Sequence, residues 1–225
     1  MKKFSVLILF ICLMQGVSAQ KLKNTKNTML DINTYIYSGI LDKFDDYEPE
    51  TKREKELLER NEKYLESKVE LTALNTFYAQ FDSVGLPIED KDALIDFVNY
   101  SANGLPNPLI PKATIKKIVK KGYESDYYLI FKINIRYEER SKGILNAVRV
   151  VNPEVEARIR IFTPERKLYR EVKYALSMTE DMKSSDFPGL RFDKLDRAYI
   201  DYFYNKIEPI LIEVVEKTVD LLARQ

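Results

Sequence analysis

The chain has 225 residues, with 36 Lys and Arg against 35 Asp and Glu, no His, no Trp and a single Cys. Without histidine, Ser-His-Asp catalysis and His-ligated zinc or iron sites are excluded. The near-neutral charge argues against nucleic acid as the main partner, because binding its phosphates needs a concentrated excess of Lys and Arg. Binding functions, oxygen-ligated Ca²⁺ or Mg²⁺, hydrolysis by paired carboxylates and Ser/Lys or Tyr chemistry remain open.

The N-terminus has the pattern of a secretory signal peptide. Lys2 and Lys3 precede the apolar run Val6–Met14, and the small residues Val17-Ser18-Ala19 follow it. This order predicts cleavage after Ala19. The apolar run is shorter than the roughly 18 residues that a membrane span needs, so we expect an exported mature chain with no transmembrane segment. Periplasmic retention and full secretion both remain open.

Cleavage at this point also removes Cys12, so the mature chain would fold by packing alone, without disulfides. It would keep 34 Lys and Arg against 35 Asp and Glu, a net charge of about −1. The remaining length suits one domain. We expect a partly mobile N-terminal lead over 20–50 and a single domain over 51–225. Residues 30–48 fit a strand and a helix equally well.

The first predicted helix begins at residue 51. Thr51 and Glu54 form a capping box, in which each side chain satisfies an unpaired backbone N–H at the helix start. Apolar residues then follow a seven-residue period. This predicts a helix packed on its own domain, with a coiled-coil partner surface as the alternative. The predicted apolar stripe consists of Leu57, Leu58, Leu65, Tyr64, Leu71 and Tyr78.

Two shorter helices complete the predicted helical part, 51–121. Asp90 can cap a helix over 91–100, and the proline-rich segment 105–111 is expected to be an extended connector. A helix over 112–121 follows, with Ile115 and Ile118 inside. Gly122 then occupies the position where a left-handed C-cap is usual.

The second half, 122–225, predicts a sheet and a long helix. Alternating apolar residues indicate strands over 127–137, 153–162 and 168–177, and the tight connection Thr163–Lys167 joins the last two. Short connections make these strands an antiparallel meander. A C-terminal helix with a kink near Pro209 is expected to follow. The predicted fold class is therefore α+β, an antiparallel β-meander covered on one face by helices, with a long C-terminal helix.

Two groups of residues are candidates for ligand or partner binding. Five lysines near one helix end could attract an anion, although lysines there also offset the helix dipole and solvate the exposed face. Two tyrosines are turned away from the expected core by the periodicity of their elements and could present a ring and a hydroxyl to a partner. These candidates are Lys112, Lys116, Lys117, Lys120, Lys121, Tyr128 and Tyr204.

Carboxylates offer no assignable catalytic or metal site. The acidic turn over 45–50 lacks the spacing of a calcium loop. Glu154 and Glu156 lie on an exposed strand face, where cross-strand pairing with arginines is the simplest account. We expect those arginines to be Arg136, Arg158 and Arg160. No catalytic residue, metal site or cofactor is predicted.

Residues 112–225 resemble small periplasmic envelope modules, such as the N-terminal domain of TolB and the curli-secretion lipoprotein. The resemblance rests on the order of a basic helix, a strand led by Ser125-Asp126-Tyr127, meander strands and a long terminal helix. It implies an envelope interaction role with protein partners, whereas the residues also allow an anionic or apolar ligand. A non-catalytic envelope binding protein is thus expected, with a carboxylate-dependent glycan hydrolase as the alternative.

Overall fold

The computed structural model describes residues 22–37, 50–89, 111–120, 122, 124–142, 148–179, 182–183 and 197–224. The predicted signal peptide over 1–19 and the predicted helix over 91–100 lie outside these residues. The elements are β1 (Asn27–Ile36), α3 (Lys52–Ser83), α4 (Pro111–Lys120), β2 (Tyr127–Lys142), β3 (Val148–Phe162), β4 (Leu168–Ser177), β5 (Met182–Lys183) and α5 (Arg197–Arg224).

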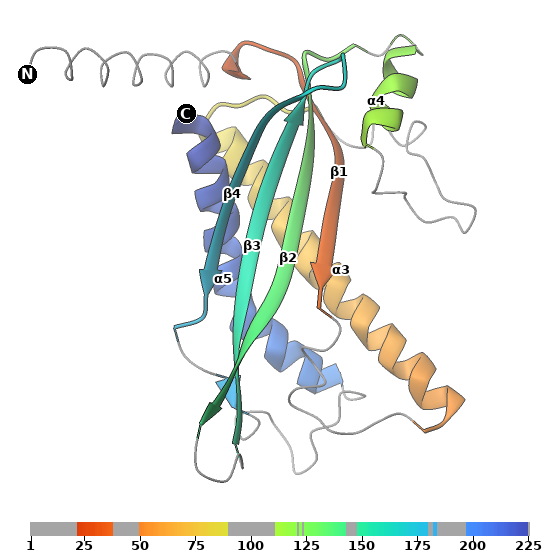
Figure 1. The fold of residues 1–225 in the computed structure, drawn as a ribbon, viewed down its shortest axis with the longest axis vertical. Coiled ribbons are helices and arrows are strands. Elements are labelled where there is room, and N and C mark those ends of the chain that lie inside the picture. Colours follow the sequence, from red (N-terminus) through yellow and green to blue (C-terminus); the bar gives the residue numbers. More distant parts are fainter. Residues whose placement is uncertain are drawn as a thin grey trace, which may run out of the picture.

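The strands form one mixed sheet in the order β1-β2-β3-β4 (Figure 1). The pairs β2–β3 and β3–β4 are antiparallel, so the predicted meander is confirmed. β5 pairs with β3 near the start of that strand, at Val150 and Val151. The segment 20–50, expected as a lead, contributes β1, which pairs parallel to β2. Tertiary pairing thus gives residues 30–36 the strand conformation that their sequence left open, and the strand also includes Asn27–Met29 of the expected lead.

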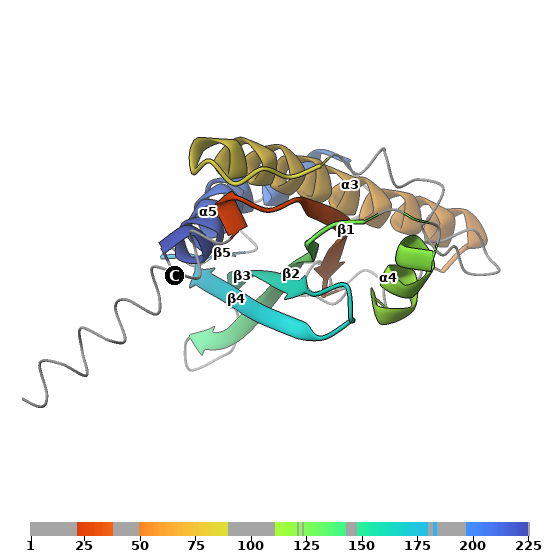
Figure 2. The same cartoon turned by 90° about the horizontal axis from the view of Figure 1, so that it is seen from above.

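Helices α3 and α5 cover one face of the sheet, called the inner face here (Figures 1 and 2). This face holds the predicted inward residues of the three meander strands. Phe131, Ile133, Val155 and Ile159 are each 0% exposed. α5 runs through Pro209 as one continuous helix and buries Phe203, Ile207, Leu211 and Val214 against the sheet and α3. The α+β fold class with a long C-terminal helix is confirmed.

The apolar stripe predicted for α3 is correct at Leu65, which is buried, but wrong as a row. Its buried residues follow a four-residue step, whereas Leu71 of the predicted stripe is 61% exposed. The error arises because the seven-residue period also fits a row beside the true contact, where Tyr64 and Tyr78 only flank the core. The buried row is Asn61, Leu65, Val69, Ala73, Phe77 and Phe81.

α4 packs on the opposite face of the sheet, called the outer face here (Figure 2). Ile115 and Ile118, predicted to be the buried side of this helix, contact a small apolar cluster with Leu30, Tyr128 and Phe162. Gly122 follows the helix with φ +84°, the left-handed conformation expected there. The helices therefore do not all lie on one face, because α4 covers one end of the outer face.

Two local predictions are confirmed by hydrogen bonds. Glu54 N–H donates to Thr51 Oγ1 at 3.2 Å and Thr51 N–H donates to Glu54 Oε2 at 2.9 Å, which completes the capping box of α3. In the β3–β4 connection, Arg166 N–H donates to the Thr163 carbonyl at 2.8 Å and Arg166 adopts φ +67°. None of the helices that the structure describes has an apolar stretch long enough to cross a membrane.

Candidate functional site

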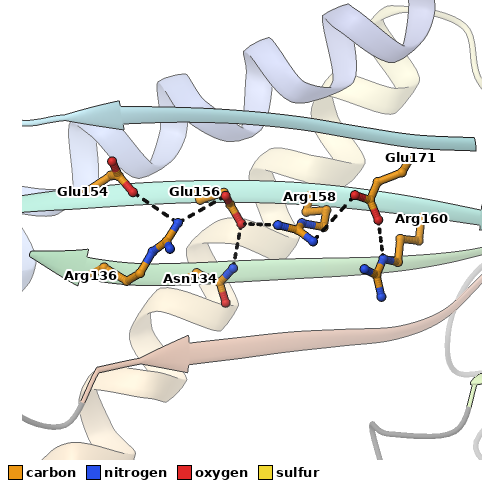
Figure 3. Close-up of polar contacts among 7 residues, drawn as sticks. All are labelled: Asn134, Arg136, Glu154, Glu156, Arg158, Arg160 and Glu171. Carbon is orange, nitrogen blue, oxygen red and sulfur yellow. Dashed lines mark hydrogen bonds and ion pairs between the residues drawn. The ribbon is translucent and has the colours of Figure 1, made fainter.

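The candidate site lies on the outer face, where strand alternation places polar side chains. On β3, Glu154, Glu156, Arg158 and Arg160 point away from the helices, as their two-residue spacing predicts. The register puts Arg136 of β2 opposite Glu154, and it puts other polar residues of β2 and β4 beside the rest. These side chains form what we call the ion-pair ladder: Asn134, Arg136, Glu154, Glu156, Arg158, Arg160 and Glu171 (Figure 3).

Glu156 is the centre of the ladder. Its side chain is only 8% exposed, and it accepts a hydrogen bond from Asn134 Nδ2 at 2.8 Å. Arg158 Nη2 lies 3.0 Å from Glu156 Oε1, and Arg136 Nη2 lies 3.3 Å from Oε2. Both carboxylate oxygens are therefore partnered, which is what a buried charge on a sheet face requires.

The ends of the ladder are more exposed. Arg136 Nη2 also lies 3.2 Å from Glu154 Oε1, and the Arg136 side chain is 52% exposed. At the other end, Glu171 of β4 pairs with both Arg158 and Arg160, and the Arg160 side chain is 47% exposed. The predicted cross-strand pairing is confirmed for Arg136, which contacts both Glu154 and Glu156. Arg158 instead pairs with Glu156 along its own strand, and Arg160 pairs with Glu171 rather than with either predicted glutamate. The part played by Asn134 and Glu171 was missed.

The ladder fixes the charge of Glu156. Burial alone raises the pKa of this carboxyl, but the hydrogen bond from Asn134 and the charges of Arg158 and Arg136 outweigh it and leave the pKa below its ordinary value. A general acid in glycoside hydrolysis needs the opposite, a raised pKa. Glu156 is therefore an anion at neutral pH, which suits a structural or binding role better than acid catalysis.

A second alignment crosses the outer face beside Glu156. Lys132 of β2 is opposite Arg158 of β3, which in turn is opposite Lys173 of β4. The two lysines are exposed, and no residue that the structure describes forms an ion pair with either of them. We call Lys132, Arg158 and Lys173 the cation row. Sequence reasoning missed the row because it depends on the register of three strands.

The lysine candidates lie on α4 and immediately after it. Lys112, Lys116, Lys117 and Lys120 belong to the helix, and Lys116 and Lys120 are exposed. Lys121 lies outside the described residues, as do the side chains of Lys112 and Lys117. Because α4 packs on the outer face, Lys116 and Lys120 lie on the same side of the sheet as the ion-pair ladder.

The two tyrosine candidates are both buried. Tyr128 is on the outer face, as its alternation predicts, but α4 covers it, and its exposed fraction is 0%. For Tyr204 the expected orientation away from the core is wrong: it is 5% exposed and lies between α3 and α5. Its hydroxyl donates to Glu208 Oε1 at 2.7 Å and contacts Thr72 Oγ1 at 2.5 Å. The periodicity of a single element cannot predict that α4 covers Tyr128 or that α3 packs against Tyr204.

The surroundings of Tyr204 join α3 to α5. Lys68 Nζ lies 4.3 Å from the Tyr204 ring centroid and 2.7 Å from Asp201 Oδ1. The hydrogen bond from Lys68 lowers the pKa of Asp201, although partial burial opposes this effect. Tyr64 also donates to Asp201 Oδ1, at 2.9 Å. This polar cluster ties the two helices together, so Tyr204 acts in packing.

Within the described residues, no group of three or more acidic or sulfur side chains could hold a metal ion.

The chain is similar to several solved structures at low sequence identity. The lipoprotein GNA1162 of Neisseria meningitidis has a TM-score of 0.40 and 11% identity, covering 88% of this chain and 99% of its own. The hypothetical protein CT253 of Chlamydia trachomatis has a TM-score of 0.36 and 9% identity, covering 86% and 98%.

The third structure is assigned as a neuraminyllactose-binding hemagglutinin homologue of Helicobacter pylori, with a TM-score of 0.34 and 12% identity, covering 89% of this chain and 91% of its own. At TM-scores below 0.5, these likenesses decide neither the fold nor the function of this chain. No protein-family profile and no curated protein matches the sequence.

Proposed function

We propose that the protein is an exported, non-catalytic interaction protein of the bacterial cell envelope, which binds its partner on the outer face of the sheet. The observation that carries the proposal is the ion-pair ladder around the nearly buried Glu156. Its charged groups are fixed by mutual contacts before any partner arrives. A surface held in this way loses little conformational freedom on binding.

The energetics of the ladder support an interaction role. Exposed ion pairs such as Arg160–Glu171 contribute only about 0–1 kcal/mol to folding. Charges arranged across a surface instead select partners and fix their orientation. Under this proposal Arg136 and Arg160, each about half exposed at one end of the ladder, are the groups that contact the partner.

The lysines of α4 extend the proposed surface. Lys116 and Lys120 are exposed on the side of the sheet that carries the ladder. The burial of Ile115 and Ile118 fixes the orientation of α4 on the outer face. We therefore retain the lysine cluster as a second part of the interface, while Tyr128 and Tyr204 serve packing.

The test compares capture of envelope components by three forms of the protein. Arg136→Ala/Arg160→Ala removes both exposed ends of the ladder. Arg53→Ala/Arg60→Ala makes the same change of charge on exposed positions of α3. After cross-linking in cells, we expect a defined partner with the wild type and the α3 variant and its loss with the ladder variant. Equal capture by all three forms would refute the outer face as the binding surface.

Export has its own test. The signal-peptide pattern predicts that the mature chain begins at Gln20. N-terminal sequencing of the protein recovered from the producing cells should give Gln20. A protein that still begins at Met1 would contradict export by cleavage and, with it, the envelope part of the proposal.

A further inference from the structure

The cation row is a feature that the fold itself does not explain. Neighbouring strands lie about 4.8 Å apart, so the backbone positions of Lys132, Arg158 and Lys173 lie side by side within about 10 Å on the outer face. Like charges directly opposite each other in a sheet are destabilising. Arg158 is compensated by Glu156 and Glu171. Among the described residues, no carboxylate forms an ion pair with Lys132 or Lys173.

We infer that the cation row binds carboxylate side chains of an acidic segment in a protein partner, an inference that rests on the proposed function. Each lysine ends in an ammonium group with three N–H donors on a flexible stem. The two stems flank Arg158, so both ammonium groups can turn toward one carboxylate above the row. A bound carboxylate would offset the repulsion that the free protein retains.

The charges around the row favour a protein segment over a continuous polyanion. Both carboxylates next to the row lie on the outer face. Glu171 is two residues from Lys173 along β4, on one side of the row, and Glu156 is two residues from Arg158 along β3, on the other side. An anionic membrane or a sulfated glycan would place negative charge over these carboxylates as well. A protein segment can place single acidic residues over the row and neutral or basic residues over Glu156 and Glu171.

A second copy of the chain is a less suitable occupant. The outward order of charges on β3, two glutamates followed by two arginines, is complementary to its own reverse. However, the described outer-face positions of β2, β3 and β4 over 130–136, 154–160 and 171–177 carry five cations against three carboxylates. Two such faces would meet with the same net sign, which opposes association.

The experiment uses the mature chain that begins at Gln20 and a labelled peptide in which glutamate alternates with serine. A peptide with glutamine in place of glutamate is its neutral control. The variant Lys132→Gln/Lys173→Gln removes the two lysines that form no ion pair with a described residue. Lys52→Gln/Lys55→Gln removes the same charge from exposed positions at the start of α3. Binding is measured by fluorescence anisotropy at low and at physiological salt, and thermal unfolding is recorded for every form.

We expect the glutamate peptide to bind the wild type and the control variant Lys52→Gln/Lys55→Gln, and to bind both more weakly as the salt concentration rises. The cation-row variant should lose roughly tenfold or more in affinity, which corresponds to the loss of one or two close charge contacts. Its melting temperature should not fall, because the substitution relieves repulsion. A lower melting temperature with unchanged peptide binding would assign the lysines to folding and overturn the inference.

Other outcomes also overturn it. These are equal binding of the glutamate and glutamine peptides, binding of anionic phosphatidylglycerol vesicles or heparin in preference to the peptide, and a dimer of the free chain that the cation-row variant abolishes. The proposed function is tested separately by Arg136→Ala/Arg160→Ala. If that variant loses its cellular partner while the cation-row variant keeps it, the outer face is the interface and the acidic segment is not what the row binds.

Discussion

The two faces of β3 carry different side chains, because successive residues point alternately to the inner and the outer face. On the inner face Val155, Ala157, Ile159 and Ile161 are each 0% exposed beneath the helices. On the outer face the side chains of Glu154, Arg158 and Arg160 are 31%, 25% and 47% exposed. Full burial of an aliphatic side chain contributes about 1.5–3 kcal/mol, whereas an exposed ion pair contributes about 0–1 kcal/mol.

This comparison separates stability from recognition. The inner face and the helices α3 and α5 supply most of the free energy of folding. The outer face carries fixed charges that contribute little to the free energy of folding. Substitutions on the inner face should therefore unfold the protein, while substitutions at the ends of the ladder should change binding and leave the fold intact. Glu156 is the intermediate case, because it is charged and nearly buried.

The largest effect is expected on the inner side. Leu211→Asp and Val214→Asp place a carboxylate at positions that are 0% exposed within the apolar core. A buried unpaired charge costs about 3 kcal/mol or more. Urea unfolding should show this loss for both variants. A free energy of unfolding unchanged from the wild type would show that α5 does not bury this face.

Glu156→Gln should have the next largest effect. The variant keeps the size of the side chain but removes the charge that partners Arg158 and Arg136, so a loss of about 1–3 kcal/mol is expected. Urea unfolding at neutral pH measures it. The matched substitution Glu165→Gln, in the exposed β3–β4 turn, is the control. Equal effects of the two substitutions would mean that the ladder does not stabilise the fold.

The pH dependence of stability, compared between the wild type and Glu156→Gln, sharpens the comparison. Because the pKa of Glu156 is lowered in the folded protein, its stabilising contribution is complete above the unfolded value of about 4.3. That contribution is lost as the pH falls further, through the folded pKa. The difference in unfolding free energy between wild type and Glu156→Gln should therefore shrink below about pH 4. A difference that stays constant down to pH 2 would contradict the ladder as its source.

Tyr204→Phe tests polar contacts within the helix layer. The hydroxyl bridges Thr72 and Glu208, and removing it should cost about 1 kcal/mol while the ring stays packed. Urea unfolding gives the stability, and the cross-linking assay gives partner binding. We expect binding to be unchanged, since Tyr204 is buried between α3 and α5. Loss of the partner with an intact fold would place the interface on the helices instead.

The smallest effect on stability is expected for Arg160→Ala. The Arg160–Glu171 pair is 47% and 30% exposed, so its removal should change the free energy of unfolding by only about 0.5 kcal/mol or less. Partner capture by the same variant should nevertheless decrease. A loss of stability as large as that of Glu156→Gln would remove the distinction between the two parts of the ladder.

Local patterns were sufficient to predict many elements. The alternation in Tyr127–Tyr137, the capping box at Thr51 and the left-handed position of Gly122 each depend on neighbours a few residues away. The sequence therefore predicted the meander strands, the start of α3 and the end of α4. The pairing of Arg136 with Glu154 and Glu156 also followed, because the strand face and the opposite charges were both visible in the sequence.

The remaining features depend on contacts between distant segments. The heptad pattern of α3 could not select the buried row, because rows at both three- and four-residue steps contain apolar side chains and only packing on the sheet and α5 distinguishes them. The period of α5 likewise could not show that α3 covers Tyr204. In β1, pairing with β2 determined the conformation that local sequence left open.

By itself the sequence determined the residue types on each strand face, the helix ends and the α+β class, because these follow from spacing along one segment. Tertiary structure decided which strands are neighbours and in what register. That choice placed Lys132, Arg158 and Lys173 in one row and enclosed Glu156 between Asn134 and two arginines. The physical reason is that register is fixed by the turns and by burial of the whole inner face, so no single strand encodes which charges become neighbours across the sheet.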